Sequence, residues 1–248
     1  MSLLISTDGR IRHLRIDRPT RRNALDRATA LALTVALHQA AADPGIGAVV
    51  LAGTGPCFCA GSDLKELAGK SPAEMAAIET TKATLARTIA ALEIPVVAAV
   101  HGYALGGGAA LAAACDAVVS DTDAGWHLPE VVNGWIPPWG LHPLLARCGS
   151  LRARQLLWAP TRIDGAAAAQ LGLVDQCCPT GQALAVASRQ AVAWAALPPA
   201  ASRSIKPYLR DIADRSAAEA DALASSLFTA HCATPEALTT FSRFGAKP

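Results

Sequence analysis

Two glycine-containing segments of the sequence could each bring backbone N–H groups against a bound ligand. One is GTGPCFCAGSDLKEL, residues 53–67, and the other is HGYALGGGAAL, residues 101–111. Each follows an apolar run that predicts a buried strand, and each leads through glycine into a predicted helix. The first N–H groups of a helix have no internal partner, and the helix dipole favours negative charge at that end. Two such ends directed at one point would form an oxyanion hole, in which main-chain amides stabilise a developing negative charge.

Either segment taken alone also has a purely structural explanation, because glycine-rich turns between strands and helices are common in α/β proteins. The triple glycine at 106–108 lacks the GxGxxG spacing of a dinucleotide-binding loop. The sequence also contains no GxSxG elbow, which argues against a serine hydrolase of the α/β-hydrolase type. The two segments together therefore favour oxyanion binding over these alternatives.

The elements that must position these segments alternate along the chain. We predict strands at residues 3–6, 11–17, 47–55, 95–100, 116–121 and 173–179. We predict helices at residues 22–45, 63–70, 71–93 and 109–115, followed by two C-terminal helices separated at 233–236. This alternation is typical of the α/β class. The chain is expected to divide into a core at 1–195 and a helical region at 196–248.

Three helix starts carry capping patterns. Asn23 is the expected N-cap of the first long helix. Asp63 and Glu66 have the spacing of a capping box. Ser71 and Pro72 are expected to begin the helix at 71–93.

Bulk composition limits the class of protein. A chain of 248 residues is long enough for one large domain, and its net charge of +2 argues against nucleic acid as the main partner. Seven cysteines with no CxxC pair indicate reduced thiols in a cytosolic protein, not a metal site or a disulfide framework. The chargeless segment 94–115 is long enough to span a membrane. Its proline and clustered glycines instead favour a strand, a turn and a helix.

Six segments, in order along nearly the whole chain, resemble the enoyl-CoA hydratase/isomerase (crotonase) superfamily. They are DRPTRRNALD (17–26), FCAGSDLKEL (58–67), AVHGYALGGGAALAAACD (99–116), LPEVVNGWIPPWG (128–140), DGAAAAQLGLVDQCCP (164–179) and ATPEALTTF (233–241). The resemblance implies a spiral of ββα units with a C-terminal helical trimerisation region, in a homotrimer or a dimer of trimers. It also implies an acyl-CoA thioester as substrate and no separate metal or redox cofactor, with no membrane partner.

The resemblance assigns candidate binding residues. The N–H groups of Ser62 and Gly107 match the family's two donors to the thioester oxygen. Lys65 would contact the CoA phosphates, the backbone near Ala60 would lie beside the adenine, and Arg22 or its neighbours would assist. The structural alternative for Lys65 is a solvated lysine on a helix surface.

The carboxylates decide which reaction the resemblance implies. Family hydratases use two glutamates, and the position of the first, three residues after the donor glycine, is Ala110 in this chain. The position of the second is Glu130, for which a helix-start glutamate is the structural alternative. One carboxylate suffices to move a proton between two carbons, as in 3-enoyl-CoA isomerases, or to serve a hydroxycinnamoyl-CoA hydratase-lyase. A non-catalytic acyl-CoA-binding homologue is a further alternative, and Ala110→Glu is expected to raise hydration.

Tryptophans near Glu130 are candidates for the wall of an acyl site. These are Trp126, Trp135 and Trp139, which could form an apolar pocket that raises the pKa of Glu130, or could shape a site for an aromatic acyl group. Ordinary core packing is the structural alternative for each tryptophan.

Overall fold

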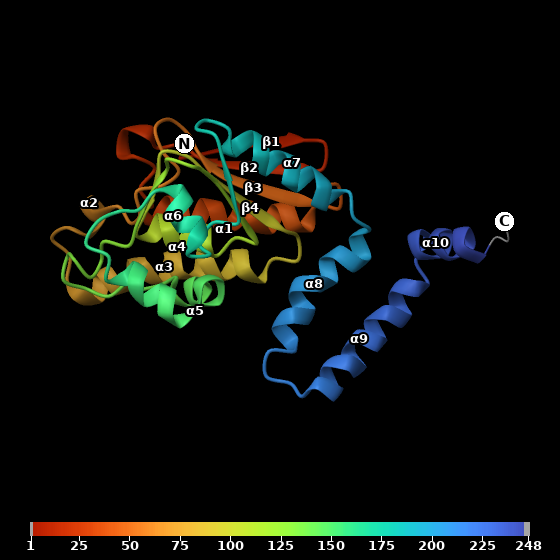
Figure 1. Ribbon diagram of the computed structural model, residues 1–248. Coiled ribbons are helices and arrows are strands. Elements are labelled where there is room, and N and C mark those ends of the chain that lie inside the picture. The colour runs from red at the N-terminus through yellow and green to blue at the C-terminus, as the bar shows by residue number, and fades with distance from the viewer. Residues whose placement is uncertain (1, 246–248) are drawn as a thin grey trace.

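A computed structural model describes residues 2–245 and shows a mixed α/β fold built on two sheets (Figure 1). The main sheet has the strand order β1-β2-β3-β4-β6-β8, and the small sheet pairs β5 with β7. The strands are β1 Leu3–Asp8, β2 Ile11–Ile16, β3 Ala48–Gly53, β4 Val96–Val100, β5 Tyr103–Leu105, β6 Ala117–Asp121, β7 Gly125–His127 and β8 Gln176–Cys178. Only the hairpin β1–β2 is antiparallel among these pairings. The crossover helices of a parallel sheet therefore supply most connections.

Helices cover both faces of the main sheet and form the C-terminal region. They are α1 Arg27–Ala42, α2 Leu64–Leu67, α3 Pro72–Ala91, α4 Gly107–Ala113, α5 Leu141–Leu157, α6 Gly165–Gln170, α7 Ala183–Ala195, α8 Pro199–Asp211, α9 Ala217–Cys232 and α10 Pro235–Gly245, with a 3₁₀ turn at Pro19–Arg21. In Figure 1, α7 lies on one side of the sheet, α1 and α3 lie on the other, and α9 and α10 extend away from it.

The strand β3 shows why a nearly continuous apolar run forms the centre of this sheet. All six of its residues are buried. Val49 and Leu51 pack into the cluster that contains the apolar residues of α1 and α3. Val50 packs into the second cluster, with Ala187 and Ala191 of α7. A parallel strand covered on both faces needs apolar side chains in both directions, which explains the absence of alternation.

The chargeless segment at 94–115 begins with the strand β4 and ends with the helix α4, as predicted, but residues 103–105, expected in the turn, form the strand β5. Gly106 separates β5 from α4 and has a φ of 51°. Within residues 2–245, no helix combines the length and the apolar character needed to cross a membrane.

The prediction that Asn23 caps the first long helix is wrong. The helix α1 begins at Arg27, and Asp26 is its N-cap, accepting a hydrogen bond from the Thr29 amide at 2.8 Å. Asn23 is buried instead, and its side-chain amide donates to the carbonyl oxygens of Thr54 at 2.8 Å and Cys57 at 2.7 Å. The Asn23 side chain therefore stabilises the loop after β3 and does not cap a helix.

The second capping prediction is half correct. Asp63 is the N-cap of α2 and accepts a hydrogen bond from the Lys65 amide. Glu66 does not return a bond to Asp63, because its carboxylate accepts from the Arg27 amide at 3.0 Å. The start of α3 agrees with the sequence pattern, since Ser71 forms a complete capping box with Glu74.

Candidate active site

The loops after β3 and β4 lie side by side because backbone hydrogen bonds join them. The Cys59 amide donates to Tyr103 O at 3.2 Å, and the Leu105 amide donates to Cys59 O at 3.0 Å. Gly61 then passes close to the second loop with a φ of 93°. A Cβ at residue 61 would lie 2.7 Å from Leu105 O and 3.1 Å from Gly107 N. Glycine is therefore required there on two grounds, its left-handed backbone and the close approach of the other loop.

This approach brings the amides of Ser62 and Gly107 together. A Cβ at Gly107 would lie 3.4 Å from Ser62 N. Gly107 is the first residue of α4, so its N–H group has no partner within the helix. Among residues 2–245, neither of the two amides donates a hydrogen bond. Both residues line one cavity of about 520 Å³, so two free donors face a space large enough for an acyl group.

Most of the cavity wall is apolar. The helices α2 and α3 supply Leu64, Leu67 and Met75, and the segment between β7 and α5 supplies Trp135 and Ile136. Trp135 is 47% exposed and Ile136 is 68% exposed, which places them towards the mouth of the cavity. Such a wall suits a hydrocarbon chain or an aromatic ring.

Glu130 lines the same cavity next to the second loop. It lies in a turn and not at the start of a helix, so the helix-dipole alternative does not apply. A Cβ at Gly106 would lie 2.7 Å from Glu130 Oε1, which places the carboxylate directly against the residue before Gly107. The residue is only 8% exposed, and Oε2 has no hydrogen-bond partner among the described residues. This carboxylate is free to accept a proton from a ligand.

Burial raises the pKa of Glu130 above its ordinary value of 4.5. The negative charge of Glu79 acts in the same direction, whereas a backbone hydrogen bond and His127 act in the opposite direction. A carboxyl group with a raised pKa in a cavity is typical of acid–base sites.

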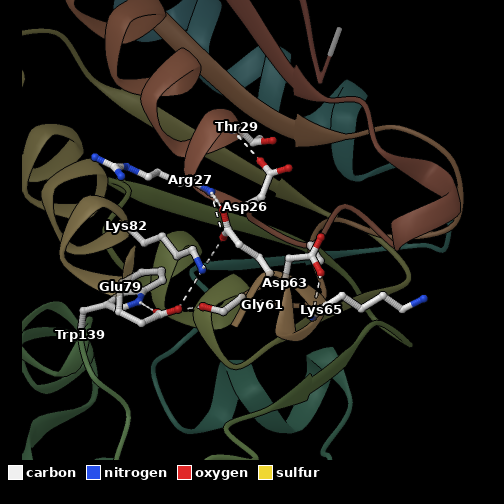
Figure 2. Close-up of polar contacts among 12 residues, drawn as sticks. Asp26, Arg27, Thr29, Gly61, Asp63, Lys65, Glu79, Lys82 and Trp139 are labelled. Carbon is white, nitrogen blue, oxygen red and sulfur yellow. Dashed lines mark hydrogen bonds and ion pairs between the residues drawn. The ribbon is translucent and has the colours of Figure 1, made fainter. Parts of the chain in front are cut away.

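Glu79 is a second buried carboxylate at this cavity, and the sequence patterns did not predict it. It lies on α3, and its Oε2 accepts hydrogen bonds from Ser62 Oγ at 2.9 Å and Trp139 Nε1 at 2.7 Å. Its Oε1 accepts from Lys82 Nζ at 2.8 Å, and the Lys82 side chain is fully buried. Figure 2 shows Lys82 and Trp139 meeting at the Glu79 carboxylate. The sequence did contain one signal for this site. Lys82 occurs at the helical spacing shared by Ile78, Leu85 and Ile89, and this spacing predicts that all four side chains face the core.

The other predicted site residues lie in different surroundings. Ala60 lines the cavity, and its amide donates to the carbonyl oxygen of Arg22 at 3.0 Å. The Arg22 and Lys65 side chains are exposed and lie outside the cavity wall, and Lys65 points away from Glu79 in Figure 2. Their contacts with CoA stay predictions.

Ala110 is buried within α4 and is not part of the cavity wall. A Cβ added at Gly140 would collide with the Ala110 methyl group, so the chain before α5 already covers this position. Its predicted contact with substrate stays a prediction.

Within residues 2–245, no cluster of three or more His, Cys, Asp or Glu side chains has the arrangement of a metal site.

Comparison with models of protein families shows which family the chain belongs to. Residues 6–245 match the model of the family described as enoyl-CoA hydratase/isomerase. The chain belongs to the enoyl-CoA hydratase/isomerase family. A 2,3-dehydroadipyl-CoA hydratase of Escherichia coli is 34% identical, over 94% of this chain and 91% of that protein. An enoyl-CoA isomerase/hydratase of Mycosarcoma maydis is also 34% identical, over 78% of this chain and 74% of that protein.

Solved structures of the family agree with the fold. An enoyl-CoA hydratase from Mycobacterium smegmatis is similar with a TM-score of 0.92 and 29% identity, covering 98% of this chain and 96% of that chain. The predicted crotonase-like α/β fold is therefore confirmed.

Proposed function

We propose that the protein acts on an acyl-CoA thioester, with the amides of Ser62 and Gly107 binding the thioester oxygen and Glu130 moving a proton. One observation supports this most strongly. Two free amides and a buried carboxylate with an unpartnered oxygen line the same cavity. Family membership supports the acyl-CoA substrate.

The chemistry follows from where charge develops. Glu130 removes a proton from the carbon next to the thioester carbonyl, and the electron pair of the broken C–H bond moves onto the carbonyl oxygen. The two amides stabilise the resulting enolate, and removing one such donor costs about 100-fold or more in rate. Glu130 then returns the proton to a different carbon as the electron pair moves back. The net reaction is isomerisation of a 3-enoyl-CoA to a 2-enoyl-CoA.

Hydration by two glutamates has weaker support. The position of the family's first glutamate holds Ala110, whose methyl group neither binds nor protonates water. Glu79 does not replace it, because three donors already occupy its carboxylate. A single-carboxylate reaction is therefore the better-supported proposal.

A single-glutamate hydratase-lyase is the second candidate, and the tryptophans favour it. Trp135 and Trp139 both line the cavity, where aromatic rings would pack against an aromatic acyl group.

We also propose that the acyl group is uncharged. The E. coli relative is named for a dicarboxylic acyl group, but this cavity presents two carboxylates, Glu79 and Glu130, and the ammonium of Lys82 is already paired.

Turnover assays with three thioesters test the proposal. The wild-type protein is expected to isomerise a 3-hexenoyl-CoA faster than it hydrates crotonyl-CoA, and feruloyl-CoA cleavage would favour the hydratase-lyase. Glu130→Gln is expected to lower turnover by about 100-fold or more while CoA-thioester affinity is retained. Binding of all three thioesters without turnover of any would favour the non-catalytic homologue. Faster hydration than isomerisation would contradict the single-carboxylate mechanism.

A further inference from the structure

We propose that Glu79 is a positioning residue that sets the spacing of the two oxyanion-hole amides, those of Ser62 and Gly107. The inference rests on the proposed function, because it takes these amides as the donors to the thioester oxygen. One carboxylate oxygen of Glu79 is connected to both donors by different routes, through the Ser62 side chain and through Trp139.

The first route is a direct hydrogen bond. Ser62 Oγ donates to Glu79 Oε2 at 2.9 Å. This bond fixes the Ser62 side chain towards α3. The Ser62 backbone N–H donates no hydrogen bond among residues 2–245, and Ser62 belongs to the cavity wall. The backbone on either side of Ser62 is already held, because the Leu25 amide donates to Gly61 O at 2.7 Å and the Asp63 amide donates to Leu25 O at 2.9 Å. The fixed side chain adds a further constraint at Ser62 itself.

The second route passes through an aromatic ring. Trp139 Nε1 donates to the same Oε2 atom at 2.7 Å, and Trp139 is only 7% exposed. The six-membered ring of this indole, on the edge next to Nε1, lies against Gly107, where a Cβ would be 2.7 Å from Cζ2. The ring therefore limits the movement of Gly107 on the side of the cavity, and Glu79 fixes the ring.

Lys82 explains how a carboxylate is tolerated beside a developing oxyanion. An isolated negative charge so close to the thioester oxygen would oppose enolate formation. The Lys82 ammonium, fully buried and 2.8 Å from Oε1, compensates that charge. With three donors bound, Glu79 is an anchor for other groups rather than a group that transfers protons.

The test compares variants that keep or remove the side-chain oxygen at residue 79 that accepts from Ser62 and Trp139. Both variants also lack the Lys82 ammonium, so that it is not left without a partner. Glu79→Gln alone would leave the buried Lys82 ammonium without its anionic partner, and removing one partner of a buried ion pair is strongly destabilising. We therefore compare two double variants. Glu79→Gln with Lys82→Met keeps an oxygen for Ser62 and Trp139, whereas Glu79→Met with Lys82→Met removes it. Replacing a buried ion pair by neutral groups is often tolerated.

The expected result is a rescue by the variant that keeps the oxygen. The methionine double variant is expected to lose about 100-fold in kcat with KM changed by less than about threefold, because misplaced donors affect the transition state more than binding. The glutamine double variant is expected to retain kcat within about tenfold of wild type. Glu74→Gln is the matched control, since Glu74 is exposed on the same helix and glutamine also completes a capping box.

A binding measurement makes the test independent of turnover. Cinnamoyl-CoA absorbs at longer wavelength when its carbonyl is polarised, so each variant is combined with Glu130→Gln and titrated with this thioester. The red shift is expected in the glutamine double variant and is expected to shrink in the methionine double variant. Equal kcat values and equal absorbance shifts in the two double variants would overturn the positioning role of Glu79 and would leave the proposed function unaffected. If the Glu130→Gln protein itself neither binds nor shifts cinnamoyl-CoA, the proposed function is wrong and the positioning role is wrong with it.

Discussion

The indole of Trp139 lies against the backbone of Gly107, so closely that a Cβ at residue 107 would be 2.7 Å from Cζ2. The two residues are 32 positions apart in the sequence, and their contact forms one side of the cavity next to the Ser62 amide.

Gly107→Ala is expected to lower kcat by about 100-fold, because the added methyl group must displace either the Trp139 ring or the Gly107 amide. Steady-state kinetics with the best thioester substrate measure this loss. Gly45→Ala is the control, since Gly45 lies in an exposed loop where a Cβ would meet only the end of the Asp43 side chain. Undiminished kcat in Gly107→Ala would contradict the role of this amide.

The pH dependence of kcat/KM is expected to report Glu130. As the base, Glu130 must be ionised in the free enzyme, so activity rises with pH through its pKa. Burial raises that pKa above 4.5, and the charges of Glu79 and His127 act on it in opposite directions. The acid limb of the profile is therefore expected above pH 4.5. The glutamine double variant lacks the negative charge of Glu79, which raises the Glu130 pKa, and it also lacks the positive charge of Lys82, which acts in the opposite direction. The acid limb of this variant is therefore expected to stay near its wild-type position. An acid limb at or below pH 4.5 in the wild-type protein would contradict the assignment.

Glu130→Gln is expected to stabilise the folded protein at neutral pH. A pKa that is higher in the folded state means that folding favours the protonated carboxyl group. The contribution of this group to stability is full below its unfolded-state pKa, near 4.5, and is lost as pH rises through the folded-state value. The glutamine variant has no such loss, so its advantage grows as pH rises from 4.5 and then becomes constant. Urea unfolding at a series of pH values measures it, and a pH-independent difference would contradict the buried carboxylate.

Ala110→Glu is expected to destabilise the protein and to give no gain in hydration. The sequence alone favours a gain, because the substitution restores the family's first glutamate. The structure reverses that expectation, since Ala110 is buried against Gly140 and does not line the cavity. Overpacking of this kind costs about 1–3 kcal/mol, and a buried carboxylate adds to it.

Thermal unfolding and crotonyl-CoA hydration assays test this prediction together. Ala28→Glu is a suitable control, because Ala28 is exposed at the start of α1. A stable Ala110→Glu protein with faster hydration would show that the residues before α5 move aside to admit the side chain.

The two amide loops were predictable from the sequence because their signals are local. A buried strand, a glycine turn and a helix start occur within about fifteen residues, and the backbone supplies the donors whatever the side chains are. Glu130 was identified through the resemblance to a family, since an isolated glutamate in a loop carries no local pattern.

Glu79 and Asn23 show why the rest could not be predicted. A glutamate and a lysine three residues apart on a helix usually form a solvated pair. This pair is buried, and its Glu79 carboxylate is bonded to Ser62 and Trp139, which are distant in the sequence. Asn23 precedes a helix and has the residue type of a cap, yet its side-chain N–H₂ donates to carbonyl groups more than thirty residues away. In both cases the decisive contact joins distant segments, and helical or turn propensity carries no information about it.

The donors of Ser62 and Gly107 are main-chain groups, and this limits how the cavity can change. Their N–H groups do not titrate in the pH range of a folded protein, and substitution of a side chain leaves them present unless proline is introduced. Under the proposed function, stabilisation of an enolate would thus be retained while the wall around these amides is altered. Exchange of wall residues such as Met75, Asn133 and Trp135 is therefore expected to change which acyl group the cavity accepts while both amide donors are kept.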